Sequence, residues 1–526
     1  MSLPGDAKSI PYITACCLMT IVHISIIFFI IAAYLVYKGI IRIRDKDVVI
    51  NEKINMKWWS IGLSVFATDV SLSYIINTSG LSFSKGLAVG SYGWTSVIVL
   101  IVVALYILPK YMRLEIQTLP EYLELRFSPY LRLLFAIIHI LFIVLVALSF
   151  VYYSFGVLII NTFGLDPVWQ IPILSFIGLF SGLFLFAGGL KMAIKFDMYI
   201  AALILVAGIL VFSFALHAVG GFHSLAQHAQ GKLNVLLPAD DEYLPWTQVF
   251  FGGVWLLHLN YWAFFQPMTQ KVVSAESLSE AQKGLLLTAT LKLLVPFLFI
   301  IPGIVCFELY ASQVSQPDDV FSVLLKNILP AVLSPFIVLA FGFTVVSSSY
   351  AYLHAVGMMF TNDIFARFIH PKTSESLKEK VYFITILTAV LCAIIMAPYI
   401  AHSLKVSVFV QVLRYAFLPG IIVLFLIGLF HARSYAIHAW LAIILSVVLY
   451  FSSHYFFPTW IPLHVLGTNT VAIAIITLIF IFILPSKKAI TLLGNRDIRF
   501  ERNLIVLIWS MFIITLVCAI YVIFSQ

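Results

Sequence analysis

The feature that most constrains this chain is a succession of long apolar runs, each long enough to cross a lipid bilayer. A membrane-spanning helix needs about 20 mostly apolar residues. Fourteen runs meet that need and are predicted to be transmembrane helices, at residues 13–41, 58–79, 86–109, 131–161, 171–190, 196–217, 246–264, 284–309, 331–360, 382–401, 404–430, 434–454, 465–485 and 502–524. Because 62% of the residues are hydrophobic, 10% are charged and the mean hydropathy is +1.06, a water-soluble globule is excluded. The sequence predicts an all-α integral membrane protein, with residues 1–526 forming a single transmembrane domain.

Lysine and arginine are concentrated in alternate loops of this pattern, as the positive-inside rule requires of cytoplasmic loops. With the amino terminus outside, the inner loops receive most of the basic residues, Lys110, Arg126 and Lys271 among them. This predicts a multi-pass protein of the plasma membrane, or of a bacterial inner membrane, with both termini extracellular or periplasmic. The same loops explain the net charge of +8, which is therefore not evidence of nucleic-acid binding.

Polar residues cluster in the middle of the second run, where Thr68, Asp69, Ser71 and Ser73 lie within six residues. A polar cluster in hydrocarbon is tolerated only where it is buried in protein or lines a cavity. Serine and threonine can also bond back to their own helix, but an ionisable group near a helix centre costs about 3 kcal/mol or more. Asp69 is therefore predicted to have a functional role.

A second group of hydroxyls lies in the ninth run, at Thr344, Ser347, Ser348 and Ser349. The first three are spaced i, i+3 and i+4, so their oxygens share one helix face. Such a stripe can join neighbouring membrane helices. Two oxygen-rich patches on different helices are also what a dehydrated alkali cation requires, and we expect the patches of the second and ninth runs to meet.

Two further charges lie inside predicted spans. Lys292 is about two turns into its run and could extend its ammonium group to the inner surface. Arg414 follows Gln411 by one turn and precedes Pro419 and Gly420, a helix-breaking pair. Arg414 could therefore face either a cavity or the outer interface.

The chain shows no catalytic constellation. It has no HExxH motif, and His139, His258 and His354 lie singly in different runs, where histidines with satisfied hydrogen bonds in the packing are expected. An enzyme is therefore not expected. A sensor or channel built on a transporter fold is the other alternative, but no fused signalling domain is apparent in the sequence.

Seven segments in order carry a resemblance to a known family. They are WWSIGLSVFATDVS at 58–71, LPEYLELRF at 119–127, GGLKMAIKFD at 188–197, YWAFFQPMTQKVVSAESLSEAQKG at 261–284, LKLLVPFLFIIPG at 291–303, VVSSSYAYLHAVGMMFTNDIF at 345–365 and FVQVLRYAFLPG at 409–420. On these segments the chain resembles the sodium/solute symporters, which include sodium/glucose, proline, pantothenate and sialic-acid carriers. The resemblance covers most of the chain, and LPEYLELRF is its most specific part.

This resemblance implies a leucine-transporter type of fold, in which two inverted five-helix repeats surround a site at the membrane midplane and work by alternating access. On that basis residues 58–430 form the inverted-repeat core, 13–41 an extra N-terminal helix and 434–526 peripheral C-terminal helices. The implied activity is sodium-coupled symport of a small polar solute. The expected partners are Na⁺, the solute and the lipid bilayer, with no organic cofactor and no obligate protein partner.

The resemblance also implies where sodium binds. In the family, backbone carbonyls of the first core helix and hydroxyls of the eighth form the main sodium site, and Asp69 matches a position where proline carriers also have aspartate. The corresponding residues here are Ala67, Val70, Thr344, Ser347 and Ser348, beside Asp69.

Two further expectations concern the ions. A proton could replace sodium, because Asp69 can titrate and an unpaired buried carboxylate has a raised pKa. A second sodium site is not expected, since Ala351 stands where some relatives have an additional hydroxyl.

The departures from the family concern the substrate. Sugar carriers have glutamate or glutamine where this chain has Ser73 and Tyr74, glutamate where it has Gly93, and asparagine or aspartate where it has Phe265. A hexose without these partners would leave hydroxyls unpaired, at about 1 to 3 kcal/mol for each buried group.

Other positions favour an amino acid or carboxylate. Lys292 and Gln411 match family positions at the substrate site, whereas the arginine that clamps the carboxylate in sialic-acid carriers corresponds to Val146 here. Arg414 could replace that clamp, because a guanidinium binds carboxylates through two hydrogen bonds. A sodium/sugar or sodium/inositol symporter is the alternative.

Overall fold

The computed structural model describes residues 55–484 and 503–525 except for 230, 331 and 403, together with Ile30, Tyr34 and Tyr37, but not the side chains of 401–411 and 413. The predicted run at 13–41 therefore lies outside the described residues apart from those three positions.

The regular secondary structure of the described residues is all helical, with two isolated β-bridges and no strand. Its α-helices are α2 (Trp58–Asp69), α3 (Leu72–Lys85), α4 (Gly90–Val102), α5 (Leu108–Leu114), α6 (Leu119–Arg126), α7 (Pro129–Phe142), α8 (Ser149–Phe163), α9 (Gln170–Ala218), α10 (Phe222–His228), α11 (Trp246–Phe251), α12 (Gly253–Ala263), α13 (Gln266–Val272), α14 (Leu278–Lys292), α15 (Val295–Tyr310), α16 (Val320–Asn327), α17 (Leu333–Met358), α18 (Glu375–His402), α19 (Leu404–Phe430), α20 (Ala436–Phe456), α21 (Pro462–Ile483) and α22 (Leu504–Phe524). Short segments of other helix types join several of them, including the π-helices η3 (Ile143–Leu148) after α7 and η7 (Met359–Ile369) after α17.

Nine helical segments within the described residues are long and apolar enough to cross a membrane, judged by length and composition. The predicted runs at 171–190 and 196–217 fall in one segment, because α9 continues through a kink at Gly189. Gly189 has φ 57° and ψ −164°, a conformation that glycine adopts without steric cost. The integral membrane class is confirmed, while the count of fourteen spans stays a prediction.

Two helices are broken near the middle of the molecule. The predicted second run divides into α2 and α3, separated at Val70 and Ser71, where the Ser71 hydroxyl accepts a hydrogen bond from the Tyr74 amide at 3.3 Å and begins the next helix. A second break follows the seventh run, 246–264, since α12 ends at Ala263 and α13 begins at Gln266; within the run, α11 and α12 are separated at Gly252. Each break frees backbone carbonyls and amides from helical hydrogen bonds.

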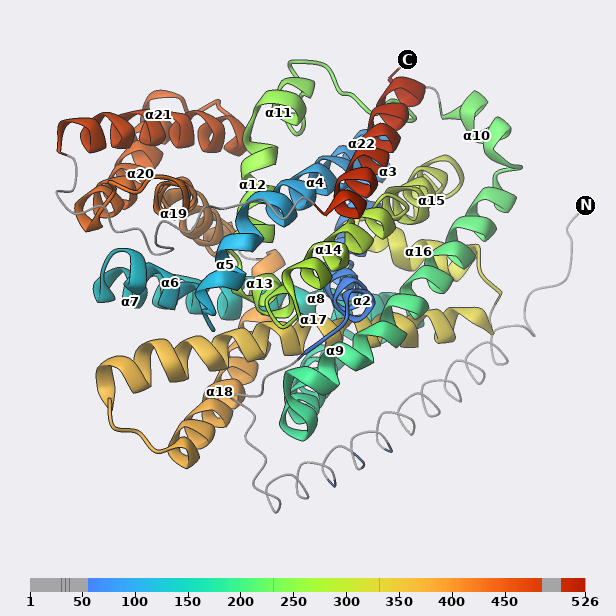
Figure 1. Cartoon of the computed structure of the whole chain (residues 1–526). Coiled ribbons are helices and arrows are strands. Elements are labelled where there is room, and N and C mark those ends of the chain that lie inside the picture. The colour runs from blue at the N-terminus through green and yellow to red at the C-terminus, as the bar shows by residue number, and fades with distance from the viewer. Residues whose placement is uncertain are drawn as a thin grey trace, which may run out of the picture.

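The broken helix α2–α3 lies inside the bundle (Figure 1). Helix α14 packs on α2, α15 packs on α3, and α17 packs along both α9 and α2. Helices α19, α20 and α21 pack on one another at one side of the bundle, at the upper left of Figure 1. The proposed division into a core at 58–430 and peripheral helices at 434–526 stays a prediction.

Three basic residues assigned to inner loops are buried, which corrects that part of the topology argument. Lys271 is fully buried in α13, and Arg126 and Lys110 are 2% and 8% exposed. Arg126 donates to the carbonyl of Gly428 at 2.9 Å, and Lys110 donates to the carbonyl of Leu429, both at the C-terminal end of α19. Helix C-termini carry unpaired carbonyls and partial negative charge, so they can hold cations away from water.

Candidate cation and solute site

The serine pair of α17 meets the broken end of α2, as the sequence predicted. Ser347 and Ser348 are both fully buried. The Ser348 hydroxyl donates to the carbonyl of Thr68 at 3.2 Å, and the Ser347 and Thr68 hydroxyls lie 3.4 Å apart. The two hydroxyl patches therefore form one oxygen-rich cluster between α2 and α17.

The backbone of α2 leaves the helical conformation at this cluster. The Val70 amide still donates to the Phe66 carbonyl at 2.9 Å, but Val70 itself has φ −83° and ψ 61°. Ala67 and Val70, the two predicted carbonyl ligands, thus bracket the end of the helix. Thr344, the third predicted hydroxyl, donates to the Phe341 carbonyl of its own helix at 2.8 Å.

A buried ion pair lies directly beside these hydroxyls. The Lys271 ammonium group in α13 is 2.7 Å from the Asp197 carboxylate in α9, and both side chains are 0% exposed. Asp197 also accepts hydrogen bonds from Ser347, at 2.6 Å, and from Ser64, while Lys271 donates to the Thr68 hydroxyl. The pair therefore fixes the orientation of hydroxyls from both α2 and α17.

Sequence reasoning missed this pair. The sequence pattern assigns Lys271 to an inner loop and gives Asp197 no role beyond its place at the end of the family segment 188–197. One signal was available in the sequence. Lys271 follows the run at 246–264 by seven residues and Asp197 lies at the start of the run at 196–217. An ionisable group near a membrane span needs a partner of opposite charge, so the two could have been expected to pair.

A second buried ion pair joins Asp69 of α2 to Lys292 of α14. The two side chains are 6% and 4% exposed, and the Lys292 ammonium group also lies 5.1 Å from the centre of the Tyr74 ring and 5.6 Å from that of Trp262. The structure thus places Lys292 in the interior rather than at the inner surface. It also gives Asp69 a cationic partner.

This second pair borders a cavity of about 540 Å³, which we call the central cavity. Its polar and charged lining residues are Asp69, Ser71, Ser73, Tyr74, Asn77, Thr78, Tyr92, Ser96, Glu242, Tyr243, His258, Tyr261, Lys292, Tyr352, Arg414 and Tyr415. The predicted substrate residues Ser73, Tyr74, Lys292 and Arg414 are therefore brought together. The side chain of Gln411 lies outside the described residues.

Tyr74 occupies the space beside Gly93. A Cβ atom added at Gly93 would lie 3.6 Å from the Tyr74 hydroxyl and 3.0 Å from Pro296. A glutamate at this position would contact these two residues. Where sugar carriers have an acidic group, this chain therefore has a glycine next to the aromatic side chain of Tyr74.

Arg414 of α19 is exposed and lines two cavities. Among the described residues no carboxylate lies within ion-pair distance of its guanidinium, which instead lies 5.6 Å from the centre of the Tyr415 ring. Arg414 thus lines the cavities while its side chain stays exposed.

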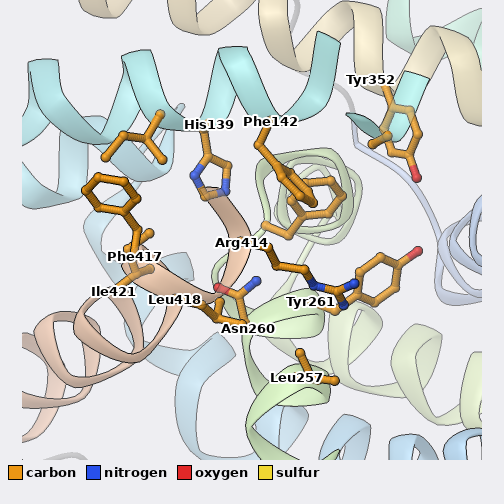
Figure 2. A pocket seen from close by; sticks show the side chains of 13 residues that line it. His139, Phe142, Leu257, Asn260, Tyr261, Tyr352, Arg414, Phe417, Leu418 and Ile421 are labelled. Atoms are coloured by element: carbon orange, nitrogen blue, oxygen red, sulfur yellow. The ribbon is translucent and has the colours of Figure 1, made fainter. Parts of the chain in front are cut away.

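The second cavity, of about 220 Å³, lies between α7, α12, α17 and α19 and is called the side chamber here (Figure 2). It is lined by Ile138, His139, Phe142, Ala147, Leu257, Asn260, Tyr261, Phe265, Tyr352, Arg414, Phe417, Leu418 and Ile421. Phe265, a predicted substrate residue, belongs to this chamber and stacks on Tyr261 at 5.6 Å. Val146, the position of the missing clamp, lines neither cavity.

The expectation for the histidines is only partly correct. His354 is satisfied, with Nδ1 2.6 Å from the Tyr382 hydroxyl. The Nε2 atoms of His139 and His258 are buried without a hydrogen-bond partner among the described residues, and each ring lines a cavity. Packing alone therefore does not account for these two.

Comparison with known families agrees with this geometry. The family model described as the sodium:solute symporter family matches residues 53–445. The chain is 29% identical to a sodium/glucose cotransporter of Vibrio parahaemolyticus over 419 residues, covering 75% of this chain and 76% of the relative. It is 26% identical to sodium/glucose cotransporter 1 of Oryctolagus cuniculus, covering 72% of this chain and 63% of that protein. The chain thus spans less than two thirds of the second relative.

Solved structures show the same fold at low sequence identity. A structure of a Na⁺-coupled sialic acid symporter in a substrate-bound outward-open state matches with a TM-score of 0.76 at 19% identity, covering 89% of this chain and 99% of that one. The transporter Mhp1 in a closed conformation matches with a TM-score of 0.50 at 11% identity, covering 81% and 92%. These neighbours have the leucine-transporter type of fold, which the sequence predicted.

Proposed function

The chain belongs to the sodium:solute symporter family, and from that premise we propose that it couples sodium entry to the uptake of a small organic carboxylate, amino acids included. Sodium binds between the end of α2 and α17, through the carbonyls of Ala67 and Val70 and the hydroxyls of Thr344, Ser347 and Ser348. The solute binds in the central cavity.

The observation that carries this proposal is the pair of adjacent residues Thr68 and Asp69. The Thr68 carbonyl accepts a hydrogen bond from Ser348 of the proposed cation site, while Asp69 lines the central cavity. The same helix break thus has the cation on one side and the solute on the other. A ligand that orders this helix break raises the affinity for the other ligand. Such coupling is reciprocal.

Arg414 supports a carboxylate as the substrate. Asp69 and Lys292 compensate each other's charge, whereas the Arg414 guanidinium has no carboxylate partner among the described residues. A carboxylate bound there would form charge-assisted hydrogen bonds. The bound carboxylate would supply the ion-pair partner that Arg414 lacks, while Glu242, which also lines the cavity, forms no ion pair with Arg414 among the described residues.

A sugar or inositol is the second candidate. Relatives are described as a sodium/glucose cotransporter and as sodium/myo-inositol cotransporter 2, at 29% and 26% identity. Against it, a side chain in place of Gly93 would begin 3.0 Å from Pro296 and 3.6 Å from the Tyr74 hydroxyl. Proton coupling is less well supported, because that hypothesis requires an unpaired carboxylate and Asp69 is paired with Lys292.

The experiment is uptake into proteoliposomes loaded without sodium and diluted into sodium or potassium buffer. The radiolabelled panel contains amino acids, monocarboxylates, dicarboxylates, glucose and inositol. We expect one carboxylate class to accumulate above its external concentration only with the inward sodium gradient. Accumulation of glucose or inositol alone would show that the substrate is a sugar or inositol and not a carboxylate. Accumulation driven by a proton gradient would overturn sodium coupling.

A further inference from the structure

The side chamber contains two buried polar atoms without partners. His139 is 5% exposed, and its Nε2 atom has no hydrogen-bond partner among the described residues. The same is true of the Oδ1 atom of Asn260. Figure 2 shows the imidazole of His139 on α7 and the amide of Asn260 on α12 both directed into the chamber. A buried unpaired polar group costs about 1 to 3 kcal/mol, so two in one chamber point to an occupant that supplies the missing bonds.

The rest of the chamber wall is apolar. Phe142, Phe265, Phe417, Leu418 and Ile421 line it. This composition, with a few convergent polar groups on an apolar surface, is typical of ligand sites. The volume of about 220 Å³ is smaller than the roughly 300 to 1,000 Å³ of complete small-molecule sites, so the chamber fits part of a ligand.

Arg414 and Tyr261 connect the chamber to the central cavity, since both residues line both cavities. In Figure 2 the Arg414 side chain extends through the middle of the view towards the Tyr261 ring. A carboxylate on the guanidinium can therefore direct the remainder of its molecule into the side chamber.

We propose that the side chamber is a subsite for the tail of the transported carboxylate, with Arg414 holding the carboxylate, the aromatic and aliphatic wall holding an apolar body, and His139 with Asn260 binding a terminal hydroxyl. This rests on the proposed function and specifies its substrate class as an elongated, amphipathic carboxylate. A hydroxyl suits the far end because it donates one hydrogen bond, which Asn260 Oδ1 accepts, and its oxygen accepts one from His139 Nε2 in the tautomer that carries the proton there.

The length of the tail is tested first, by competition against the labelled solute or by thermal stabilisation of the purified protein in sodium buffer. The probes are unbranched monocarboxylates of two to eight carbons and the matching alcohols. We expect the affinity of the acids to rise about fourfold for each methylene group buried, until the chamber is full. The alcohols, which lack the anionic group, should bind at least tenfold more weakly.

Ala147→Leu tests the chamber itself, because Ala147 lines it and a leucine would occupy part of its volume. The variant should abolish the increase in affinity with the chain length of the acid. Its affinity for acetate should stay within twofold of wild type. Val146→Leu, one residue earlier and lining neither cavity, is the matched control. If affinity does not depend on length, or if both variants behave alike, the subsite is overturned while sodium-coupled uptake of short carboxylates still stands. If no carboxylate binds at any length, the proposed function fails together with the subsite.

The polar end is tested with 3-phenylpropionate and 3-(4-hydroxyphenyl)propionate. The hydroxylated acid should bind at least fivefold more tightly to wild type, and Asn260→Leu should abolish that difference without reducing the affinity for the phenyl acid. Equal affinities in the wild-type protein would contradict the role of His139 and Asn260. A preference that survives in both His139→Phe and Asn260→Leu would contradict it as well.

Discussion

The molecule contains two buried lysine–aspartate pairs that lie close to the same helix break but have different surroundings. Lys271 and Asp197 are both 0% exposed and are surrounded by hydroxyls of α2 and α17. Lys292 and Asp69 are 4% and 6% exposed and border a cavity of about 540 Å³. One pair is enclosed in protein, and the other faces the proposed path of the solute.

This difference assigns the two pairs different roles. An enclosed pair cannot exchange its partner for water or ligand, so Lys271 and Asp197 act as positioning residues for the hydroxyls that they bind. A pair at a cavity can be solvated or contacted by a substrate, so Lys292 and Asp69 are suited to binding. The same residue types thus serve structure in one place and recognition in the other, and solvent access decides which.

The largest effect is expected from Lys271→Met, which leaves the Asp197 carboxylate buried without a cation. Breaking a buried pair in this way costs about 3 to 5 kcal/mol, so we expect little folded protein and no transport. The double variant Lys271→Met with Asp197→Asn removes both charges and should recover most of the thermal stability. Melting curves in detergent test this, and a Lys271→Met protein as stable as wild type would contradict an enclosed, structural pair.

Asp69→Asn should give the opposite pattern. The Lys292 ammonium group that it leaves behind borders the central cavity and can be hydrated there, so we expect the melting temperature to stay near that of wild type. Sodium-driven uptake should fall at least tenfold, because the substituted group lines the solute site. A fall in stability equal to that of Lys271→Met would show that the two pairs do not differ in role.

Arg414→Gln sharpens the contrast between cation site and solute site. The loss of a charge-assisted hydrogen bond of about 1.5 to 3 kcal/mol should raise the KM for a carboxylate roughly 10- to 100-fold. The sodium concentration that gives half-maximal uptake, measured at saturating solute, should stay within twofold. An unchanged KM would remove the carboxylate proposal, and Arg414→Lys, which keeps the charge but not the planar fork, serves as the comparison.

A third pair, Lys85 with Asp241, extends the comparison to the surface, with side chains 33% and 12% exposed. Burial tends to raise the pKa of Asp241, but hydrogen bonds from Lys85 and from the Leu244 and Tyr243 amides outweigh it, so the pKa lies below its usual value. A carboxyl with a lowered folded pKa stabilises the protein fully above its unfolded pKa of about 3.9, and this contribution is lost as pH falls through the folded value.

Asp241→Asn should therefore be the mildest of these changes, costing under about 1 kcal/mol at pH 7. The difference from wild type should shrink as the pH falls below about 4. Melting temperatures measured from pH 7 downwards test this, with Asp240→Asn as the neighbouring control. A difference that grows on acidification would contradict the sign of the shift.

The sequence predicted the parts of this structure that follow from local pattern. Apolar runs predicted the membrane class, and the spacing of Ser347 and Ser348 together with the polar centre around Asp69 predicted that the two patches would meet. The pairing of Lys271 with Asp197 could not be predicted in this way, because it joins residues 74 positions apart in sequence on α13 and α9. The side chamber likewise depends on how α7, α12 and α19 pack, which no single segment encodes.

The central claim is that sodium binds where α17 meets the end of α2, and its most direct test is a sodium titration of solute uptake in proteoliposomes by wild type, Ser348→Ala and Ser349→Ala. Ser349 is equally buried on the same helix, but its hydroxyl lies beside Tyr152 and not among the hydrogen bonds at the end of α2, which makes it the matched control. We predict that Ser348→Ala raises the half-maximal sodium concentration at least tenfold, while Ser349→Ala leaves it within twofold. An unchanged sodium dependence in Ser348→Ala, with uptake otherwise intact, would contradict the proposed cation site.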